Sequence, residues 1–201
     1  SVSKEALRNE LHLPQDKILF GHIGRLSNKG VDKGAEFVID SVSKLNNPHV
    51  GICFVGCTEE ESERYREYAR TRGVSDQCLF LGHVPHERIP RYIHAMDFLL
   101  LIQPSSEAAM YHTSSLKSFE YMSSGVPVCV TDLPSLREFY NETNAIFFAS
   151  GNAESLFDAM RFALTHTDEV RLRGARAQED ARAFDWEERQ YRILSFIEQQ
   201  S

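Results

Sequence analysis

Six short apolar runs recur along the first 149 residues, and they constrain the fold more than any other feature. They are ILFGHIG (18–24), VGICFVG (50–56), CLFLG (78–82), DFLLLI (97–102), VPVCV (126–130) and AIFFA (145–149). The runs contain many β-branched and aromatic residues and are apolar throughout, so strands formed from them would have no face toward solvent. Segments with helical spacing separate most of the runs. This alternation predicts an α/β fold, with a parallel sheet and helices on both of its faces.

Three of the intervening segments have helical features. They are GAEFVIDSVSKL (34–45), EEESERYREYARTRG (59–73) and HERIPRYIHAM (86–96). The first places five residues on one side, namely Phe37, Val38, Ser41, Val42 and Leu45. The second reads as a charged, mostly solvated helix that ends at Gly73, and Pro90 in the third fits a first helical turn.

From Asn152 onward the pattern is helical only. A length of 201 residues with 42% apolar residues is enough for one domain with a real core. We therefore expect a single α/β domain over 1–201, with 152–201 as an appended helical tail. The tail would pack across the edge of the sheet or against something outside this chain.

Composition excludes several classes of protein. No apolar run approaches the length of a membrane span, and the start, SVSKEALRNELHL, lacks the layout of a signal peptide. A net charge of −7 disfavours nonspecific binding to nucleic acid. These features predict a soluble, cytoplasmic protein, in which an anionic ligand needs a local cluster of positive charge.

The four cysteines are Cys53, Cys57, Cys78 and Cys129, and they lie mostly inside apolar runs. No CxxC pair and no nearby histidine spacing suggests a zinc site. The sequence predicts buried free thiols and no metal centre.

Loops after the strands are the first place to look for chemistry, because ligands of an open parallel sheet bind beyond the carboxyl ends of its strands. The loop after the first run, GRLSNKGVDKG (24–34), begins at Gly24 and carries Arg25, Lys29 and Lys33. It matches neither GxGxxG nor the phosphate loop that ends in GK[ST]. Phosphate is the natural partner of such a loop, although Lys29 and Lys33 could equally solvate a long turn.

The segment TSSLKSFEYMSSGVPV (113–128) follows the fourth run and its loop. Thr113, Ser114 and Ser115 are good N-cap residues, so a helix beginning there would direct free N–H groups toward the same edge of the sheet. Lys117 falls in the first turn, where a cation is unfavourable unless an anion binds there too. The alternative is that Lys117 is simply exposed.

Glu120 is an unexpected charge in this helix. It follows Leu116 by four residues and shares an apolar stripe with Leu116 and Phe119. A half-buried carboxylate costs several kcal/mol unless donors satisfy it. The two hydroxyls of a ribose would do so, and so would a salt bridge to a neighbouring arginine.

Four segments, in order, resemble one known family. They are GHIGRL with KGAEFVIDSVSKL, then CLFLGHV with RYIHAMDFLLLIQPS, then SSLKSFEYMSSGVPVCVTDLPSLREF, and last FDWEERQYRIL. This series is similar to the C-terminal, donor-binding domain of the family-4 (group 1) retaining glycosyltransferases of the GT-B fold. The resemblance covers nearly the whole chain and implies a Rossmann-like parallel sheet of about six strands with helices on both faces.

The resemblance also implies roles for individual residues. The arginine and lysine that hold the nucleotide diphosphate correspond to Arg25 and Lys33, and Lys29 remains a candidate because the spacing is longer than usual. The glutamate that binds ribose hydroxyls corresponds to Glu120. Arg25, Lys33 and Glu120 are thus the residues expected to carry catalysis.

The remaining donor contacts follow from the same resemblance. Backbone amides near Ser115, Leu116 and Lys117 would meet the distal phosphate. The nucleobase would lie against the main chain of Gly82, His83 and Val84.

One position departs from the family pattern. The earlier glutamate that stands near the donor sugar in many members is replaced by His112, and Glu107 is only a weak substitute. The identity of the sugar therefore stays open.

The implied reaction is transfer of a sugar, with retention of configuration, from a UDP-, GDP- or ADP-sugar to an acceptor such as a glycan or lipid-linked saccharide. No cofactor or metal is expected. The partner would be an N-terminal domain that binds the acceptor and supplies any contact with the inner face of the membrane, so this chain alone would be inactive.

Two other readings remain. A noncatalytic nucleotide-binding module would use the same crevice. A sugar epimerase or phosphorylase of similar architecture fits less well, because no catalytic acids and no cofactor lysine can be assigned.

Overall fold

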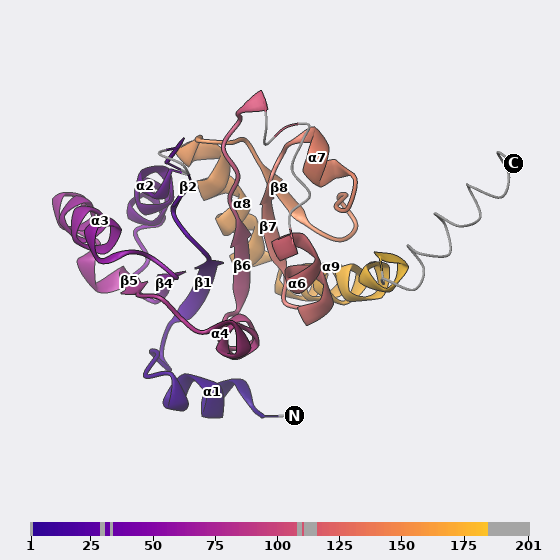
Figure 1. Ribbon diagram of the computed structural model, residues 1–201, viewed down its shortest axis with the longest axis horizontal. Helices are drawn as coiled ribbons and strands as arrows, with labels where there is room; N and C mark the ends of the chain where they lie inside the picture. Colours follow the sequence, from indigo (N-terminus) through magenta and orange to yellow (C-terminus); the bar gives the residue numbers. More distant parts are fainter. Residues whose placement is uncertain (1, 29–30, 33, 108–109, 111–115, 185–201) are drawn as a thin grey trace, which may run out of the picture.

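The computed structural model describes residues 2–28, 31–32, 34–107, 110 and 116–184. A six-stranded parallel sheet crosses the molecule in the order β5-β4-β1-β6-β7-β8 (Figure 1). The strands are β1 (Ile18–Ile23), β4 (Val50–Val55), β5 (Cys78–Leu81), β6 (Phe98–Leu101), β7 (Val128–Thr131) and β8 (Ile146–Phe148). Each coincides with one of the six apolar runs, β7 extending one residue beyond its run to Thr131, so the predicted Rossmann-like α/β fold is confirmed.

The strand order reverses between β1 and β6. The chain adds β4 and β5 on one side of β1, then returns to add β6, β7 and β8 on the other. Pairing of β1 with β4 runs from Ile18↔Val50 to Ile23↔Val55, whereas pairing with β6 is limited to Phe20↔Phe98 and Gly21↔Leu99. Beyond that point β1 and β6 separate, and such a reversal is where ligands of this fold bind.

Helices cover both faces of the sheet. One face carries α2 (Ala35–Leu45), α3 (Glu59–Thr71) and α8 (Ala153–Thr165), and the other carries α1 (Lys4–Glu10), α4 (Ile89–Ala95), α6 (Leu116–Ser124) and α7 (Pro134–Arg137). Short 3-10 turns are η1 (Ser75–Gln77), η2 (His86–Arg88) and η3 (Arg182–Phe184). Within the described residues, no helix combines the length and apolar character that crossing a membrane requires.

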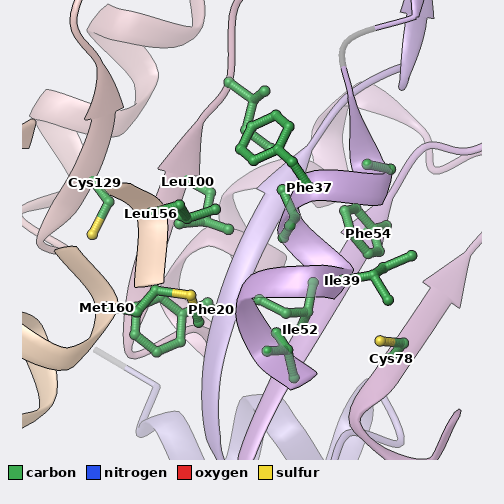
Figure 2. Close-up of a cluster of buried hydrophobic side chains, with 14 of the residues drawn as sticks. Phe20, Phe37, Ile39, Ile52, Phe54, Cys78, Leu100, Cys129, Leu156 and Met160 are labelled. Carbon is green, nitrogen blue, oxygen red and sulfur yellow. The ribbon is translucent and has the colours of Figure 1, made fainter. Parts of the chain in front are cut away.

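The core under α2 and α8 shows why these helices form where they do. Figure 2 shows Leu156 of α8 beside Leu100 and Met160 of α8 beside Phe20, and Phe37 of α2 belongs to the same cluster. The α2 stripe expected from the sequence is buried at Phe37, Val38, Ser41 and Val42, with Leu45 partly buried. Burial of each large apolar side chain contributes about 1.5–3 kcal/mol, which outweighs the modest propensity of Val38 and Val42 for helix.

The helices after Asn152 belong to this core. Side chains of α8 pack against α2, and α9 (Thr167–Ala181) places Val170 in the same core and Ala177 in the core of the opposite face. A Cβ added at Gly174 would lie 2.4 Å from the carbonyl oxygen of Gly125, so α9 crosses the turn before β7 at backbone contact. As far as Phe184, the predicted tail is therefore part of the domain rather than an appendage. Residues 185–201 are outside the described part.

Two features were not expected from the sequence. Helix α1 precedes the sheet and begins at Ser3, whose hydroxyl accepts from the N–H of Ala6. The loop after β1 contains a short antiparallel pair, β2 (Ser27–Asn28) and β3 (Val31–Asp32). This pair lies between Arg25 and Lys33 in the sequence, and it accounts for the longer spacing between them.

The prediction of free, buried cysteines is confirmed. All four are buried and unpaired with one another. Burial raises the pKa of each thiol to about 12, so the thiols are protonated at neutral pH. They therefore act as small core residues rather than nucleophiles.

A buried arginine attaches α1 to the sheet. The Arg8 side chain is 6% exposed and donates to the carbonyl of Ala95 (2.9 Å), to the carbonyl of Lys17 (2.9 Å) and to the carboxylate of Asp97 (2.6 Å). These bonds join α1, the start of β1 and the segment before β6.

Asp97 is the anion that makes this arrangement possible. Burial by itself would raise the pKa of Asp97, but donation from Lys4 and from the N–H of Leu19, with the charges of Lys4 and Arg8, lowers the pKa below its usual value. The carboxylate is therefore charged in the folded protein and stabilises it at neutral pH.

We expect Asp97→Asn to lower the free energy of unfolding by about 2–4 kcal/mol at pH 7, because Arg8 loses its buried counter-charge. The folded-state pKa is depressed, so this contribution is present above the unfolded-state pKa of about 3.9 and is lost as the pH falls through the folded-state pKa. Urea unfolding of the wild-type chain and the variant, at pH 7 and at lower pH values, measures this difference in the free energy of unfolding. The exposed Asp16→Asn variant is the control. If the Asp97→Asn variant is as stable as the Asp16→Asn variant at pH 7, the Asp97 carboxylate does not stabilise the attachment of α1 through Arg8.

Candidate functional site

The candidate site lies where β1 and β6 separate, and glycine backbone forms its floor. Gly24 ends β1 with φ +132°, and its N–H donates to the carbonyl of Val55 (2.6 Å). Gly56 ends β4 with φ +97°, and a Cβ there would lie 3.4 Å from the Cα of Gly24. Both values of φ are ones that other residues rarely adopt, so glycine permits this close contact of two turns.

Lys117 brings a positive charge to this floor. A Cβ added at Gly24 would lie 1.6 Å from Nζ of Lys117 and 2.5 Å from its Cε. The ammonium group therefore occupies the space above Gly24 that any other residue would fill. Two features that were separate in the sequence, the glycine loop and the first turn of α6, are in direct contact.

Arg25 follows Gly24 and its side chain is exposed. The guanidinium is thus available to an anion that approaches the end of β1. Lys29 and Lys33, the other cations predicted for this loop, lie outside the described residues, and so do His112 and Ser115.

The buried face of α6 differs from the expected stripe. Ser118, Tyr121 and Met122 are buried, whereas Leu116 is 73% exposed. The prediction that Glu120 shares an apolar packing stripe with Leu116 is therefore wrong. The i and i+4 relation is correct, but both residues lie on a side of the helix that the core does not cover.

Glu120 is accessible and only weakly paired. Its side chain is 35% exposed, and its Oε1 lies 3.9 Å from Nε2 of His86 on η2. In the described part of the chain this histidine, rather than the arginine considered above, is its ion-pair partner. His86 is 87% exposed, so water screens the pair and Glu120 keeps its capacity to accept hydrogen bonds.

A pocket of about 160 Å³ adjoins Glu120, between α4 and α6. Its other lining residues are His86, Ile89, Pro90, Ile93, His94, Ser123 and Ser124. The α4 side of the pocket carries Ile89, Pro90 and Ile93 together with His94, and the α6 side is polar, which suits a flat ring that carries polar groups.

The loop after β5 reaches the same edge of the sheet. The N–H of Gly56 lies 2.9 Å from the carbonyl of Leu81 and 3.1 Å from that of Gly82. Gly82 and His83 are exposed and Val84 is partly buried. The three residues predicted for the nucleobase thus directly follow β5, and Gly82 among them is bonded to the turn at Gly56.

Tyr121 is a residue that sequence reasoning missed. It is fully buried, and its hydroxyl accepts from the N–H of Ile23 at 2.9 Å. Burial raises the pKa of Tyr121, so the hydroxyl stays neutral. An aromatic residue on the buried side of a helix has no sequence signal that separates this role from ordinary packing.

Acidic residues form no metal site among the described residues, because no group of three or more His, Cys, Asp or Glu lies close enough together to hold an ion. Glu107, the weak substitute for the sugar-side acid, is exposed. Arg25 and Lys117 bring positive charge to the end of β1, and Glu61 of α3 accepts from the hydroxyl of Ser27 in the loop that follows.

Comparison with known proteins assigns the chain to a family. A match to the family described as "Glycosyl transferases group 1" spans residues 3–180. The lipopolysaccharide core biosynthesis mannosyltransferase LpsB of Rhizobium meliloti (strain 1021) is 28% identical over 189 residues, which are 89% of this chain and 50% of that protein. The chain thus spans half the length of this relative.

Solved structures agree on the fold. HepE of Anabaena, solved in complex with UDP, is similar with a TM-score of 0.81 and 20% identity over 98% of this chain and 52% of that one. The C-terminal domain of the group 1 glycosyl transferase LpcC from Francisella tularensis has a TM-score of 0.69 and 15% identity, over 91% of this chain and 97% of that domain. The architecture is that of one half of a GT-B glycosyltransferase, and the match over residues 3–180 shows that this chain belongs to the group 1 glycosyl transferase family.

Proposed function

We propose that this chain is the donor-binding half of a retaining glycosyltransferase and binds the nucleoside diphosphate of a sugar donor where β1 and β6 separate. The observation that carries the proposal is the ammonium of Lys117 lying against the bare backbone of Gly24. Glu120 follows three residues later on the same helix and is accessible. A cation and a carboxylate at this spacing match a ligand with a phosphate at one end and hydroxyls at the other.

The diphosphate would meet Lys117, Arg25 and the first amides of α6. A helix N-terminus carries partial positive charge and free N–H groups, which favour an anion and compensate for a lysine in the first turn. Because the predicted residues Lys29 and Lys33 belong to the loop after β1, they would add positive charge at the same end of the sheet.

The ribose would bind Glu120, and the base would lie against Gly82, His83 and Val84. Each ribose hydroxyl can donate to one carboxylate oxygen, and these are charge-assisted hydrogen bonds. The family membership and the complex of HepE with UDP support a nucleotide as the ligand.

Catalysis would rest on stabilisation of the leaving group. When the bond between the anomeric carbon and the phosphate oxygen breaks, negative charge accumulates on the departing diphosphate. Fixed cations at that position stabilise the transition state more than the ground state. Cationic side chains can supply this charge, so we propose that donor binding needs no metal ion.

The acceptor would bind to a second domain. The chain spans half of its mannosyltransferase relative, whose name places that protein in lipopolysaccharide core synthesis. We propose an N-terminal partner domain that holds a saccharide acceptor, on a glycan or a lipid, and makes any contact with the cytoplasmic face of a membrane. This chain alone would bind donor and transfer nothing.

Calorimetric titration with UDP, GDP and ADP, each with and without EDTA, tests the function. We expect one nucleotide to bind more tightly than the others, with an affinity that chelation leaves unchanged. Absence of binding for all three would overturn the donor site, and loss of binding in EDTA would overturn metal independence.

Glu120→Ala should weaken binding of the preferred diphosphate by about 1–3 kcal/mol, because two charge-assisted hydrogen bonds are lost. The 2′,3′-dideoxy form of the same nucleotide is the matched control. The wild-type chain should bind this form less tightly than the ribose form, whereas the Glu120→Ala variant should not discriminate. A variant that still prefers the ribose form would refute the assignment of Glu120.

Lys117→Ala should weaken binding of the nucleoside diphosphate by about 1.5–3 kcal/mol and that of the nucleoside much less, because the ammonium would contact the phosphate of the ligand rather than its ribose or base. Titration with the preferred diphosphate and its nucleoside measures the difference. Lys44→Ala, at the far end of α2, removes an exposed lysine as control and should change neither affinity. Equal losses for both ligands in Lys117→Ala would exclude the phosphate role.

A further inference from the structure

Two consecutive N–H groups at the end of β1, those of Ile23 and Gly24, donate to acceptors on different elements. The N–H of Gly24 donates to Val55 on β4. Successive N–H groups of a strand point to its two neighbours in turn, so the N–H of Ile23 points to the β6 side. Pairing of β1 with β6 stops at Gly21↔Leu99, and β6 supplies no acceptor at Ile23.

The hydroxyl of Tyr121 takes that place. It lies 2.9 Å from the N–H of Ile23, and both groups are buried. An N–H left without an acceptor in this position would cost free energy, so the bond fixes α6 to the end of β1. Lys117 precedes Tyr121 by four residues, which is one helical turn, and therefore lies on the same side of α6.

We infer that Tyr121 is a positioning residue for the nucleotide site, because its bond to Ile23 holds the ammonium of Lys117 over Gly24. The inference rests on the proposed function, since it concerns the phosphate contact of the same crevice. Ile23 and Gly24 are consecutive, so the bond and the contact join the same two elements at neighbouring points. Tilting α6 away from Ile23 would move Lys117 from Gly24.

A second buried tyrosine provides a matched control. Tyr140, after α7, is fully buried and donates from its hydroxyl to the carbonyl of Ser118 at 3.1 Å. It therefore also makes one bond between its hydroxyl and the backbone of α6. That bond reaches α6 from the segment after α7, however, and not from the end of β1.

The experiment compares Tyr121→Phe with Tyr140→Phe in the 1–201 chain, by calorimetric titration with the preferred nucleoside diphosphate and its nucleoside. Tyr121→Phe should weaken binding of the diphosphate by about five- to thirty-fold and that of the nucleoside by less than about twofold. Tyr140→Phe should leave both affinities unchanged while lowering the melting temperature by a similar amount. Equal effects of the two variants would reduce Tyr121 to a structural role and overturn the inference.

A double-mutant cycle gives the decisive test. In a Lys117→Ala background the further change Tyr121→Phe should alter diphosphate affinity by less than about twofold, because the positioned group is already absent. If the two substitutions instead weaken diphosphate binding independently, so that their fold-losses in affinity multiply, the inference is overturned. If Tyr121→Phe is too unstable at 25 °C, the cycle is measured at 10 °C, with amide exchange at Ile23 reporting loss of the bond.

The outcome also separates this inference from the proposed function. A wild-type chain that binds no nucleotide overturns both. A wild-type chain that binds normally, with an unchanged Tyr121→Phe variant, overturns the positioning role alone.

Discussion

The site depends on one contact between a cation and bare backbone, that of Lys117 with Gly24. A Cβ on residue 24 would lie 1.6 Å from the Nζ atom, so a side chain there would displace the ammonium, and the φ of +132° itself favours glycine. On the β4 side, a Cβ added at Gly56 would lie 3.4 Å from the Cα of Gly24. The end of β1 is therefore in contact with α6 on one side and with the turn after β4 on the other, and glycine permits both contacts.

Opening a sheet between two strands leaves main-chain groups without partners, and side chains satisfy them here. Nδ1 of His22 on β1 donates to the carbonyl of Leu100 on β6 at 3.1 Å. Tyr121 accepts from the N–H of Ile23. Both side chains are buried, so these bonds form away from water, where an unpaired group is most costly. Beyond the last pair of β1 with β6, side chains thus supply hydrogen bonds that strand pairing does not.

Much of this architecture could be predicted from sequence, because it follows from patterns of burial. The six strands have no solvent face, so their apolar runs mark them directly, and the stripe on α2 reports its packing in the same way. Leu116 shows where such reasoning fails, since its apolar side chain is exposed and only its neighbours in space determine that. The helices α8 and α9 were expected, but their place in the core depends on contacts such as Gly174 with Gly125, which no periodicity encodes. For the same reason the chemical types of Arg25, Lys117 and Glu120 were evident, whereas the meeting of Lys117 with Gly24 and the role of Tyr121 were not.

Overall charge and local charge act in opposite directions in this protein. The chain carries a net charge of −7, which would repel a nucleoside diphosphate at long range. At about 0.15 M ionic strength, charges farther than about 8 Å are largely screened, so acidic residues far from the end of β1 contribute little there. Lys117 is partly buried against backbone and is screened much less. The anion recognition proposed for the end of β1 would therefore be a short-range property, which requires that the cation be held in place, and the bond of Tyr121 to Ile23 would supply that constraint.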